Sequence, residues 1–217
     1  MFPTGADHLA GQHVDVRLTA EDGYSTQRSY SIATPAERDR LALSVQRIPG
    51  GEVSPYLVDD VVVGDAFELR GPIGGWFAWH PGNDQPVLLV AGGSGVVPLM
   101  VMIGERAGTN GDVPFRLIYS ATSRAAVLHA GELARHAATD DAFEVSFVFT
   151  RLSDDAARPA GRLTVADLEP PKEFFMNTAN ILICGPTGFV ETVAQMLLGM
   201  GTDPAAIKTE RFGPSGG

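Results

Sequence analysis

The chain has 217 residues, of which 44% are apolar and 19% are charged, a composition that excludes general disorder. Its net charge of −10 argues against a nucleic-acid partner, and no apolar run approaches the roughly 18 residues needed to cross a membrane. The only cysteine, Cys184, excludes an internal disulfide and an iron–sulfur cluster; because no signal peptide is present, we expect a cytoplasmic protein without a bound metal.

The first third of the chain consists of short runs of strand-forming residues separated by turn residues. Strands are predicted at residues 13–19, 28–33, 41–48, 66–70 and 76–79. Ser54 and Pro55 have the residue types of a helix N-cap and of a first helical position, which predicts a short helix through Asp59. Several short strands with regular turns are typical of a small antiparallel β-barrel.

The pattern changes after residues 80–84, which we interpret as a linker. Continuous apolar runs at 87–90, 115–119, 145–149 and 181–184 predict buried strands, and helical patterns follow the first and the last of them. Such alternation is typical of a parallel sheet covered by helices on both faces. We therefore predict two domains, a β-barrel at residues 1–82 and an α/β domain at residues 83–217.

Glycines dominate the turn after the first strand of the α/β domain. Gly92, Gly93 and Gly95 stand between a strand and a helix, where glycines let a ligand approach the backbone and free amides favour a diphosphate. The spacing is not G-x-G-x-x-G, and a tight turn without a ligand is the alternative interpretation. Cys184-Gly185-Pro186 ends a later strand of the same sheet, so Cys184 either faces the same crevice or is inert core.

The barrel carries a second candidate site. Arg28 and Tyr30 lie two residues apart on a predicted strand and therefore share one face, roughly 6.6–7 Å apart. A guanidinium beside an aromatic ring suits a ligand with both a phosphate and a flat ring, although a core tyrosine with a surface arginine is the commoner arrangement. Gly50-Gly51 then supplies a second glycine-rich turn shortly before Ser54.

Taken together, these motifs resemble the ferredoxin–NADP reductase family. They occur in family order over about residues 11–213, and they are Arg28-Ser29-Tyr30-Ser31, Gly51-Glu52-Val53-Ser54, Gly71-Pro72-Ile73-Gly74, Gly92-Gly93-Ser94-Gly95-Val96-Val97-Pro98, Cys184-Gly185-Pro186 and Glu210-Arg211-Phe212. The resemblance implies an FAD-binding barrel at 1–82 and a Rossmann-like NAD(P)-binding domain at 83–217, with hydride passing between their cofactors.

The resemblance also implies a role for each matching residue. Arg28 would hold the flavin phosphate, Tyr30 would stack on the isoalloxazine, and Ser31 would place its hydroxyl near flavin N5. Cys184 and Glu210 would flank the nicotinamide and, with Ser31, form the catalytic set. The other implied cofactor contacts are Ser29, Gly51, Glu52, Val53 and Ser54 for the flavin, and Gly92, Gly93, Ser94, Gly95, Val96, Gly185 and Pro186 for the nicotinamide nucleotide.

Three features depart from the family pattern. Only residues 1–10 precede the strand predicted at 13–19, which is too short for the family's first barrel strand, so we expect a barrel that is incomplete at the N-terminus. Many members end in an aromatic residue that covers the flavin, whereas here Phe212 is followed by five further residues. The single cysteine also excludes the [2Fe–2S] domain of some relatives, so electrons must leave to a separate acceptor.

The predicted function is transfer of hydride from NAD(P)H to FAD and of electrons to a separate protein such as a ferredoxin. The alternatives are a flavin reductase or diaphorase acting on small molecules, and a non-catalytic module that has lost tight flavin binding. NADPH is favoured over NADH because Ser123 and Arg124 suit a ribose 2′-phosphate, and because no acidic residue occurs at 119–122 to bind a free 2′-hydroxyl.

Overall fold

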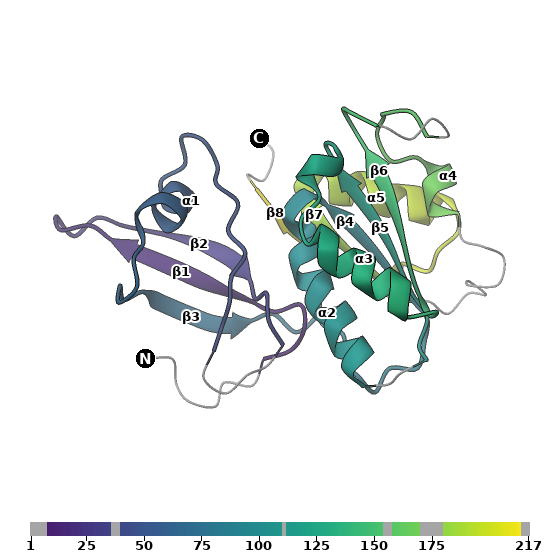
Figure 1. Ribbon diagram of the computed structural model, residues 1–217, viewed down its shortest axis with the longest axis horizontal. Coiled ribbons are helices and arrows are strands. Elements are labelled where there is room, and N and C mark those ends of the chain that lie inside the picture. The colour runs from purple at the N-terminus through teal and green to yellow at the C-terminus, as the bar shows by residue number, and fades with distance from the viewer. Residues whose placement is uncertain (1–7, 36–39, 110–111, 154–157, 170–179, 214–217) are drawn as a thin grey trace. The chain divides into compact units, whose positions relative to one another are not determined.

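The computed structural model describes residues 8–35, 40–109, 112–153, 158–169 and 180–213. The chain divides into two compact units, Met1–His80 (unit 1) and Pro81–Gly217 (unit 2), which are treated separately below (Figure 1). Among the helices in these described ranges, none is long and apolar enough to cross a lipid bilayer.

Unit 1 is built on a three-stranded antiparallel sheet in the order β2-β1-β3. In this sheet β1 (His13–Thr19) lies between β2 (Ser25–Ser31) and β3 (Glu68–Ile73). Alternation along β1 turns Val14 and Val16 to one face, where they are buried with Ile32. Partly buried side chains complete this small core: Leu18, Tyr30, Leu41, Leu43, Leu57, Phe67 and Leu69.

The helix predicted from Ser54 is present in a modified form. A single α-helical turn, α1 (Val53–Pro55), continues directly into a π-helical turn, η1 (Tyr56–Asp60). Leu57 of the second turn packs against the core of unit 1. The segment therefore ends close to the predicted residue, but its second turn is wider than an α-helix.

Two of the strands predicted in unit 1 are wrong. Residues 41–48 contain only an isolated antiparallel bridge from Leu43 to Ile32, and residues 76–79 contain a turn. Their apolar side chains are still buried in part, because burial needs only an apolar side chain, whereas a strand also needs a neighbouring strand for its hydrogen bonds. No strand precedes β1 within the described residues, so the sheet is an incomplete barrel, as predicted.

Unit 2 contains a five-stranded parallel sheet in the order β6-β5-β4-β7-β8. All four strands predicted here are present, and a fifth strand, which was not predicted, lies at one edge. The strands are β4 (Val87–Gly92), β5 (Phe115–Ala121), β6 (Phe143–Phe149), β7 (Asn180–Pro186) and β8 (Ile207–Phe212). This doubly wound arrangement confirms the predicted Rossmann-like architecture.

Helices cover both faces of this sheet (Figure 1). On one face lie α2 (Val96–Gly108) and α3 (Ala130–Thr139), and on the other lie α4 (Val165–Leu168) and α5 (Thr187–Gly199). Three short 3-10 turns connect the elements: η2 (Gly93–Gly95), η3 (Arg124–Ala126) and η4 (Pro204–Ala206).

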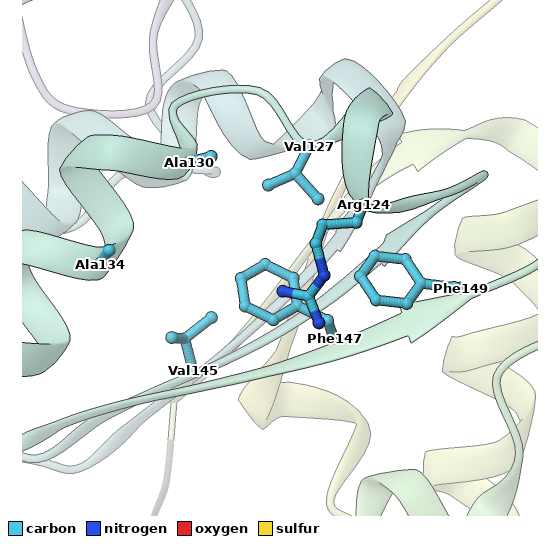
Figure 2. A pocket seen from close by; sticks show the side chains of 7 residues that line it. All are labelled: Arg124, Val127, Ala130, Ala134, Val145, Phe147 and Phe149. Atoms are coloured by element: carbon cyan, nitrogen blue, oxygen red, sulfur yellow. The ribbon is translucent and has the colours of Figure 1, made fainter. Parts of the chain in front are cut away.

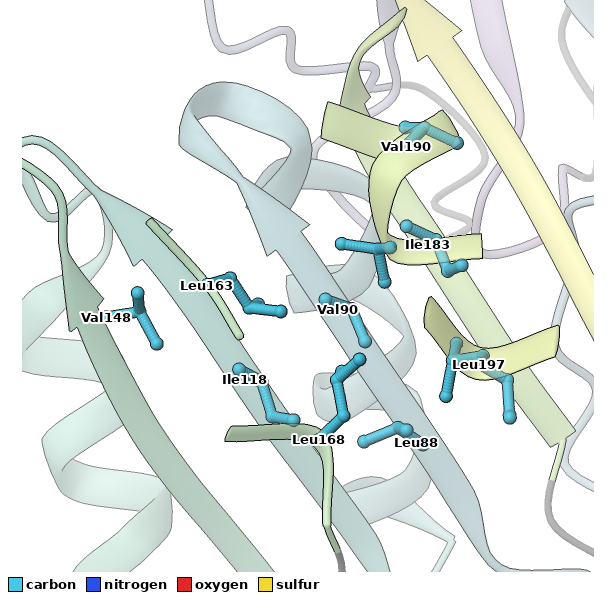
Figure 3. Packing of buried hydrophobic residues seen from close by; sticks show 11 residues of the cluster. Leu88, Val90, Ile118, Val148, Leu163, Leu168, Ile183, Val190 and Leu197 are labelled. Carbon is cyan, nitrogen blue, oxygen red and sulfur yellow. The ribbon is translucent and has the colours of Figure 1, made fainter. Parts of the chain in front are cut away.

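The central strands are buried along their whole length, which explains their continuous apolar sequences. Every residue of β4 is buried, as is every residue of β5. On the face covered by α4 and α5, side chains from both helices and four strands form one cluster (Figure 3): Leu88, Val90, Ile118, Val148, Leu163, Leu168, Ile181, Ile183, Val190, Val193 and Leu197. This core fixes the strands whose ends form the site described next.

A buried ion pair joins the C-terminal half of α2 to the segment before β6. The side chain of Arg106 is 2% exposed, and its guanidinium pairs with the carboxylate of Asp140. Arg106 Nε also donates to the carbonyl oxygen of Val113 at 2.8 Å, and the guanidinium lies 5.5 Å from the centre of the Phe115 ring. The charge of Arg106 is thus compensated on several sides inside unit 2.

Candidate functional site

The strand order of unit 2 creates a crevice at the carboxyl ends of β4 and β7. From β4 the chain continues to β5 and β6 on one side, and it then returns to β7 and β8 on the other side. In open α/β sheets ligands bind where the strand order reverses in this way. The predicted residues Gly92 and Cys184 lie at this point, because Ala91 of β4 pairs with Cys184 of β7.

The glycine-rich turn at this crevice has the geometry of an anion cradle. β4 ends at Gly92, the 3-10 turn η2 follows, and α2 begins at Val96. In the described residues no side chain caps the start of α2. Gly93 has a φ of +56°, and no described atom lies within 4 Å of the position that a Cβ would take there. An uncapped helix start beside an open glycine fits the diphosphate of a dinucleotide.

Gly95 has a different role from the ligand approach predicted for it. A Cβ atom at this position would lie 2.2 Å from the carbonyl oxygen of Cys184 and 2.4 Å from its carbonyl carbon. The missing side chain therefore lets the start of α2 pack directly against the backbone of β7.

Phe189 is a wall of the crevice that the sequence analysis missed. A Cβ on Gly92 would lie 2.6 Å from the Phe189 ring, and one on Gly185 would lie 2.8 Å from it. The ring on α5 thus fills the space that both glycines leave open. The available signal was the position of Phe189, three residues after Pro186 at the start of a helix.

Cys184 and Glu210 are neighbours across β7 and β8. They face each other in the strand register, and Cys184 is only 1% exposed. Burial, followed by the nearby Glu210 carboxylate, raises the pKa of the Cys184 thiol well above its usual value. Cys184 is therefore a protonated thiol at neutral pH, and it can shape or position a ligand but is not an activated nucleophile.

The residues beyond this pair continue in register at the same edge. Gly185 pairs with Arg211 and Pro186 pairs with Phe212, which is half-buried at the end of β8. The structure thus brings together the predicted nicotinamide contacts from β4, β7 and β8.

Ser123 and Arg124 lie at the carboxyl end of β5, on the same edge of the sheet. Ser123 precedes η3, and Arg124 is the first residue of that turn. The Arg124 guanidinium lies 5.5 Å from the centre of the Phe149 ring, in a cation–π arrangement. Its side chain is exposed, so it is accessible to a ligand.

In unit 1, β2 separates the predicted flavin residues between its two faces. Arg28 and Tyr30 share one face, and Tyr30 packs partly into the core. Burial raises the pKa of the Tyr30 hydroxyl, while the Arg28 charge lowers it, so the net pKa is raised and the phenol is neutral. The exposed Arg28 donates from Nη1 to the carbonyl oxygen of Gln27 at 2.7 Å.

The opposite face of β2 is held by Asp15, which the sequence analysis did not select. Ser29 Oγ donates to Asp15 Oδ1 at 2.6 Å, and Asp15 is buried. Ser29 therefore orients the strand that carries Arg28, Tyr30 and Ser31. A carboxylate inside an alternating strand was the only signal for this role.

The turn before α1 is tightly organised. The backbone N–H of Gly51 donates to the carbonyl oxygen of Ile48 at 3.0 Å, and Ser54 Oγ accepts from the backbone N–H of Ile48 at 3.0 Å. Val53 and Ser54 are buried, while Glu52 Oε2 accepts from the Tyr24 hydroxyl at 3.3 Å. A guanidinium, serine hydroxyls and backbone amides are donors suited to phosphate, and the Tyr30 ring suits a flat ligand, so this donor set fits a flavin nucleotide.

Comparison with known proteins agrees with both sites. The sequence model of the oxidoreductase FAD-binding domain matches residues 5–77, and that of the oxidoreductase NAD-binding domain matches residues 89–195. The chain is 30% identical over 207 residues to the toluate 1,2-dioxygenase electron transfer component of Pseudomonas putida, a match covering 95% of this chain and 59% of that protein. It is 32% identical over 208 residues to a glycine betaine monooxygenase reductase subunit of Pseudomonas aeruginosa, covering 94% and 56%.

A solved structure shows the same fold. The FAD/NAD-binding domain of nitric oxide dioxygenase from Vibrio cholerae superposes with a TM-score of 0.84 at 28% identity, covering 97% of this chain and 88% of that one. The chain spans less than two thirds of the two curated relatives named above. From the two matched domains and this architecture, the chain belongs to the ferredoxin–NADP reductase family of FAD- and NAD(P)-binding oxidoreductases.

Proposed function

We propose that this chain takes hydride from NAD(P)H through FAD and delivers electrons to a separate acceptor, with a ferredoxin-like protein as the first candidate. The observation that carries the proposal is the crevice at β4 and β7, where an open glycine turn lies at the same sheet edge as Cys184 and Glu210. The two relatives named as an electron transfer component and a reductase subunit support a separate acceptor.

We assign FAD to residues 1–82 and the nicotinamide dinucleotide to residues 83–217. Bound FAD would accept a hydride as an electron pair and release the electrons singly. Arg28 would hold a flavin phosphate, Tyr30 would cover the flavin ring, and Ser31 would donate a hydrogen bond to it. Gly51 to Ser54 would contact the diphosphate, which favours FAD over FMN.

In unit 2, the chain's own residues would position the nicotinamide. The turn from Gly92 to Val96 would bind the diphosphate, and the protonated Cys184 thiol beside Glu210 would restrict the orientation of the nicotinamide ring. Phe212 would close the flavin side of the site.

The direct test uses the purified full chain with FAD added. Bound flavin should lose its visible absorbance when NADPH or NADH is added without oxygen, and heat should release FAD that is identified by chromatography. Recovery of FMN would contradict the cofactor assignment. A chain that binds no flavin would instead be the non-catalytic module.

The acceptor is tested by the salt dependence of electron transfer. An acidic ferredoxin is repelled at long range by a net charge of −10 unless a local basic region docks it. If such a region docks it, transfer should slow as salt is added, because screening shortens to about 8 Å at physiological ionic strength. Transfer that speeds up with salt, or that occurs only to small dyes, would point to a different acceptor.

Arg28→Ala should weaken flavin binding by about 1.5–3 kcal/mol, the scale of a hydrogen bond to a charged group. Fluorescence titration of the flavin-free chain with FAD measures this change. Arg17→Ala is the matched control, because Arg17 lies on β1 and is paired with Glu68 at 3.5 Å. Equal losses in both variants would show that Arg28 makes no specific contact with the flavin.

Cys184→Ala should slow flavin reduction by NAD(P)H while leaving flavin affinity unchanged, because the thiol lies at the nicotinamide crevice. Stopped-flow absorbance measures the rate. Val148→Ala on β6 is the control, because it also removes a buried side-chain group from the sheet, although outside the crevice. An unaltered rate in Cys184→Ala would return this residue to the inert core.

Arg124→Ala should raise the KM for NADPH and leave that for NADH unchanged, because the guanidinium is the proposed partner of the 2′-phosphate. Steady-state kinetics with both dinucleotides measures the difference. Arg135→Ala, on the exposed side of α3, should change neither value. Equal increases for both dinucleotides would mean that Arg124 does not distinguish them.

A further inference from the structure

A pocket of about 140 Å³ lies between α3 and the edge strand β6 of unit 2 (Figure 2). Ala130 and Ala134 line it from α3, while Val145, Phe147 and Phe149 line it from β6. It is distinct from the nicotinamide crevice, which lies between β4 and β7. None of the family motifs quoted above contributes to its lining.

The pocket exists because α3 turns small side chains toward this part of β6. Ala130 and Ala134 are one helical turn apart and therefore share a face, whereas the large residues Leu133 and His136 are buried elsewhere along the helix. Both alanines are exposed, so the pocket opens to solvent.

Its inner wall is aromatic and flat. Phe147 and Phe149 alternate to the same face of β6, and their rings are parallel, with an interplanar angle of 7° and centres 6.0 Å apart. An apolar cavity of about 150 Å³ is large enough for a benzene ring. The wall therefore suits a single planar ring better than a branched aliphatic group.

One cation lies at the pocket. Arg124 is the one charged side chain among the described residues that line it, and Figure 2 shows its guanidinium lying beside the rings of Phe147 and Phe149. A guanidinium stacked on a ring, as Arg124 is on Phe149, keeps its in-plane N–H groups for a planar anion. The lining thus combines an apolar slot for a ring with a fork for a carboxylate.

We propose that this pocket binds a small aromatic ring carrying one anionic group, with the ring against Phe147 and the anion on Arg124. This site goes beyond the proposed function and does not depend on it, although Arg124 takes part in both. A ligand held here would occupy the guanidinium that we assign to the 2′-phosphate. It would therefore compete with NADPH and not with NADH.

The binding test is calorimetric titration of the full chain, with FAD added, using benzoate as the probe. We expect saturable binding with a Kd of about 1 mM or tighter, and affinities at least about tenfold lower for benzyl alcohol and for cyclohexanecarboxylate. The first compound lacks the charge, and the second lacks the flat ring. The methyl NMR signals of Ala130 and Ala134 should shift on titration. Lack of saturation, shifts confined to other residues, or equal binding of cyclohexanecarboxylate would overturn the proposal.

Substitutions then locate the site. Ala134→Leu fills the pocket and should abolish benzoate binding, whereas Ala138→Leu, one turn further along α3 and outside the lining, should leave it unchanged. Alanine and leucine both favour helices, so both variants should fold. Arg124→Gln should lower benzoate affinity at least about tenfold. Benzoate binding that survives in Ala134→Leu would refute the site.

The two proposals for unit 2 can fail separately. Ala134→Leu leaves Arg124 in place and should not change the KM for either dinucleotide. If benzoate does not bind while Arg124→Ala still raises the KM for NADPH, the pocket proposal is wrong and the dinucleotide proposal stands.

Discussion

Gly95→Ala should lower the free energy of unfolding of unit 2 by about 3 kcal/mol or more and abolish binding of the nicotinamide dinucleotide. The added methyl group would lie 2.2 Å from the carbonyl oxygen of Cys184 and 2.8 Å from the backbone nitrogen of Gly185. All of these neighbours are backbone atoms of β7, so no side chain can rotate to make room. Either the start of α2 or the end of β7 must move, and both form the crevice.

Chemical denaturation and dinucleotide titration measure these two effects. Gly104→Ala is the matched control, because Gly104 lies in the same helix and no described atom is within 4 Å of its Cβ position. That change should stabilise unit 2 by up to about 1 kcal/mol, since alanine favours a helix over glycine. A Gly95→Ala protein as stable as Gly104→Ala would show that α2 and β7 are not packed as described.

Asp140→Ala should lower the free energy of unfolding of unit 2 by about 3–5 kcal/mol, because it leaves the buried guanidinium of Arg106 without its counter-charge. The Asp140 side chain is only 19% exposed, so water cannot replace the lost partner fully. The variant also loses the hydrogen bond that the backbone N–H of Ala142 donates to Asp140 Oδ1 at 3.1 Å.

Two comparisons separate the charge effect from the loss of side-chain volume. Asp59→Ala removes the partner of Arg47, but these side chains are 44% and 50% exposed, so the cost should be about 1 kcal/mol or less. The double variant Arg106→Met/Asp140→Ala removes both charges and should be more stable than Asp140→Ala alone. If the double variant is less stable still, an uncompensated charge is not the cause. Denaturant unfolding curves of each protein provide the values.

The sequence predicted unit 2 better than unit 1 for a physical reason. Strands β4, β5, β6 and β7 carry continuous apolar runs, and such runs leave few alternatives to a buried parallel sheet. The edge strand β8 was missed because its sequence, IKTERF, is largely polar and its residues are only partly buried. In unit 1, residues 41–48 have a strand-like sequence, but a sequence pattern does not reveal whether a neighbouring strand is available.

The site was predictable from its motifs and not from its packing. The residues of the glycine turn, Cys184 and Glu210 were all found, and the structure places them at one sheet edge. The roles of Gly95, Phe189 and Asp15 depend on which atoms meet across the fold, and local sequence does not contain that information. The pocket behind Arg124 was missed for the same reason, because two exposed alanines give no signal in a sequence.

The small core of unit 1 makes cofactor supply a determinant of its folding. Three fully buried side chains and a three-stranded sheet leave little apolar burial to oppose the loss of chain entropy. A ligand that binds only the folded form adds about 2.7 kcal/mol at a free concentration 100 times its Kd. Flavin would then act as a folding partner of this unit, so a cell short of flavin would lose the protein itself along with its activity. Weakening substitutions in β1, β2 or β3 would remain hidden while flavin is plentiful.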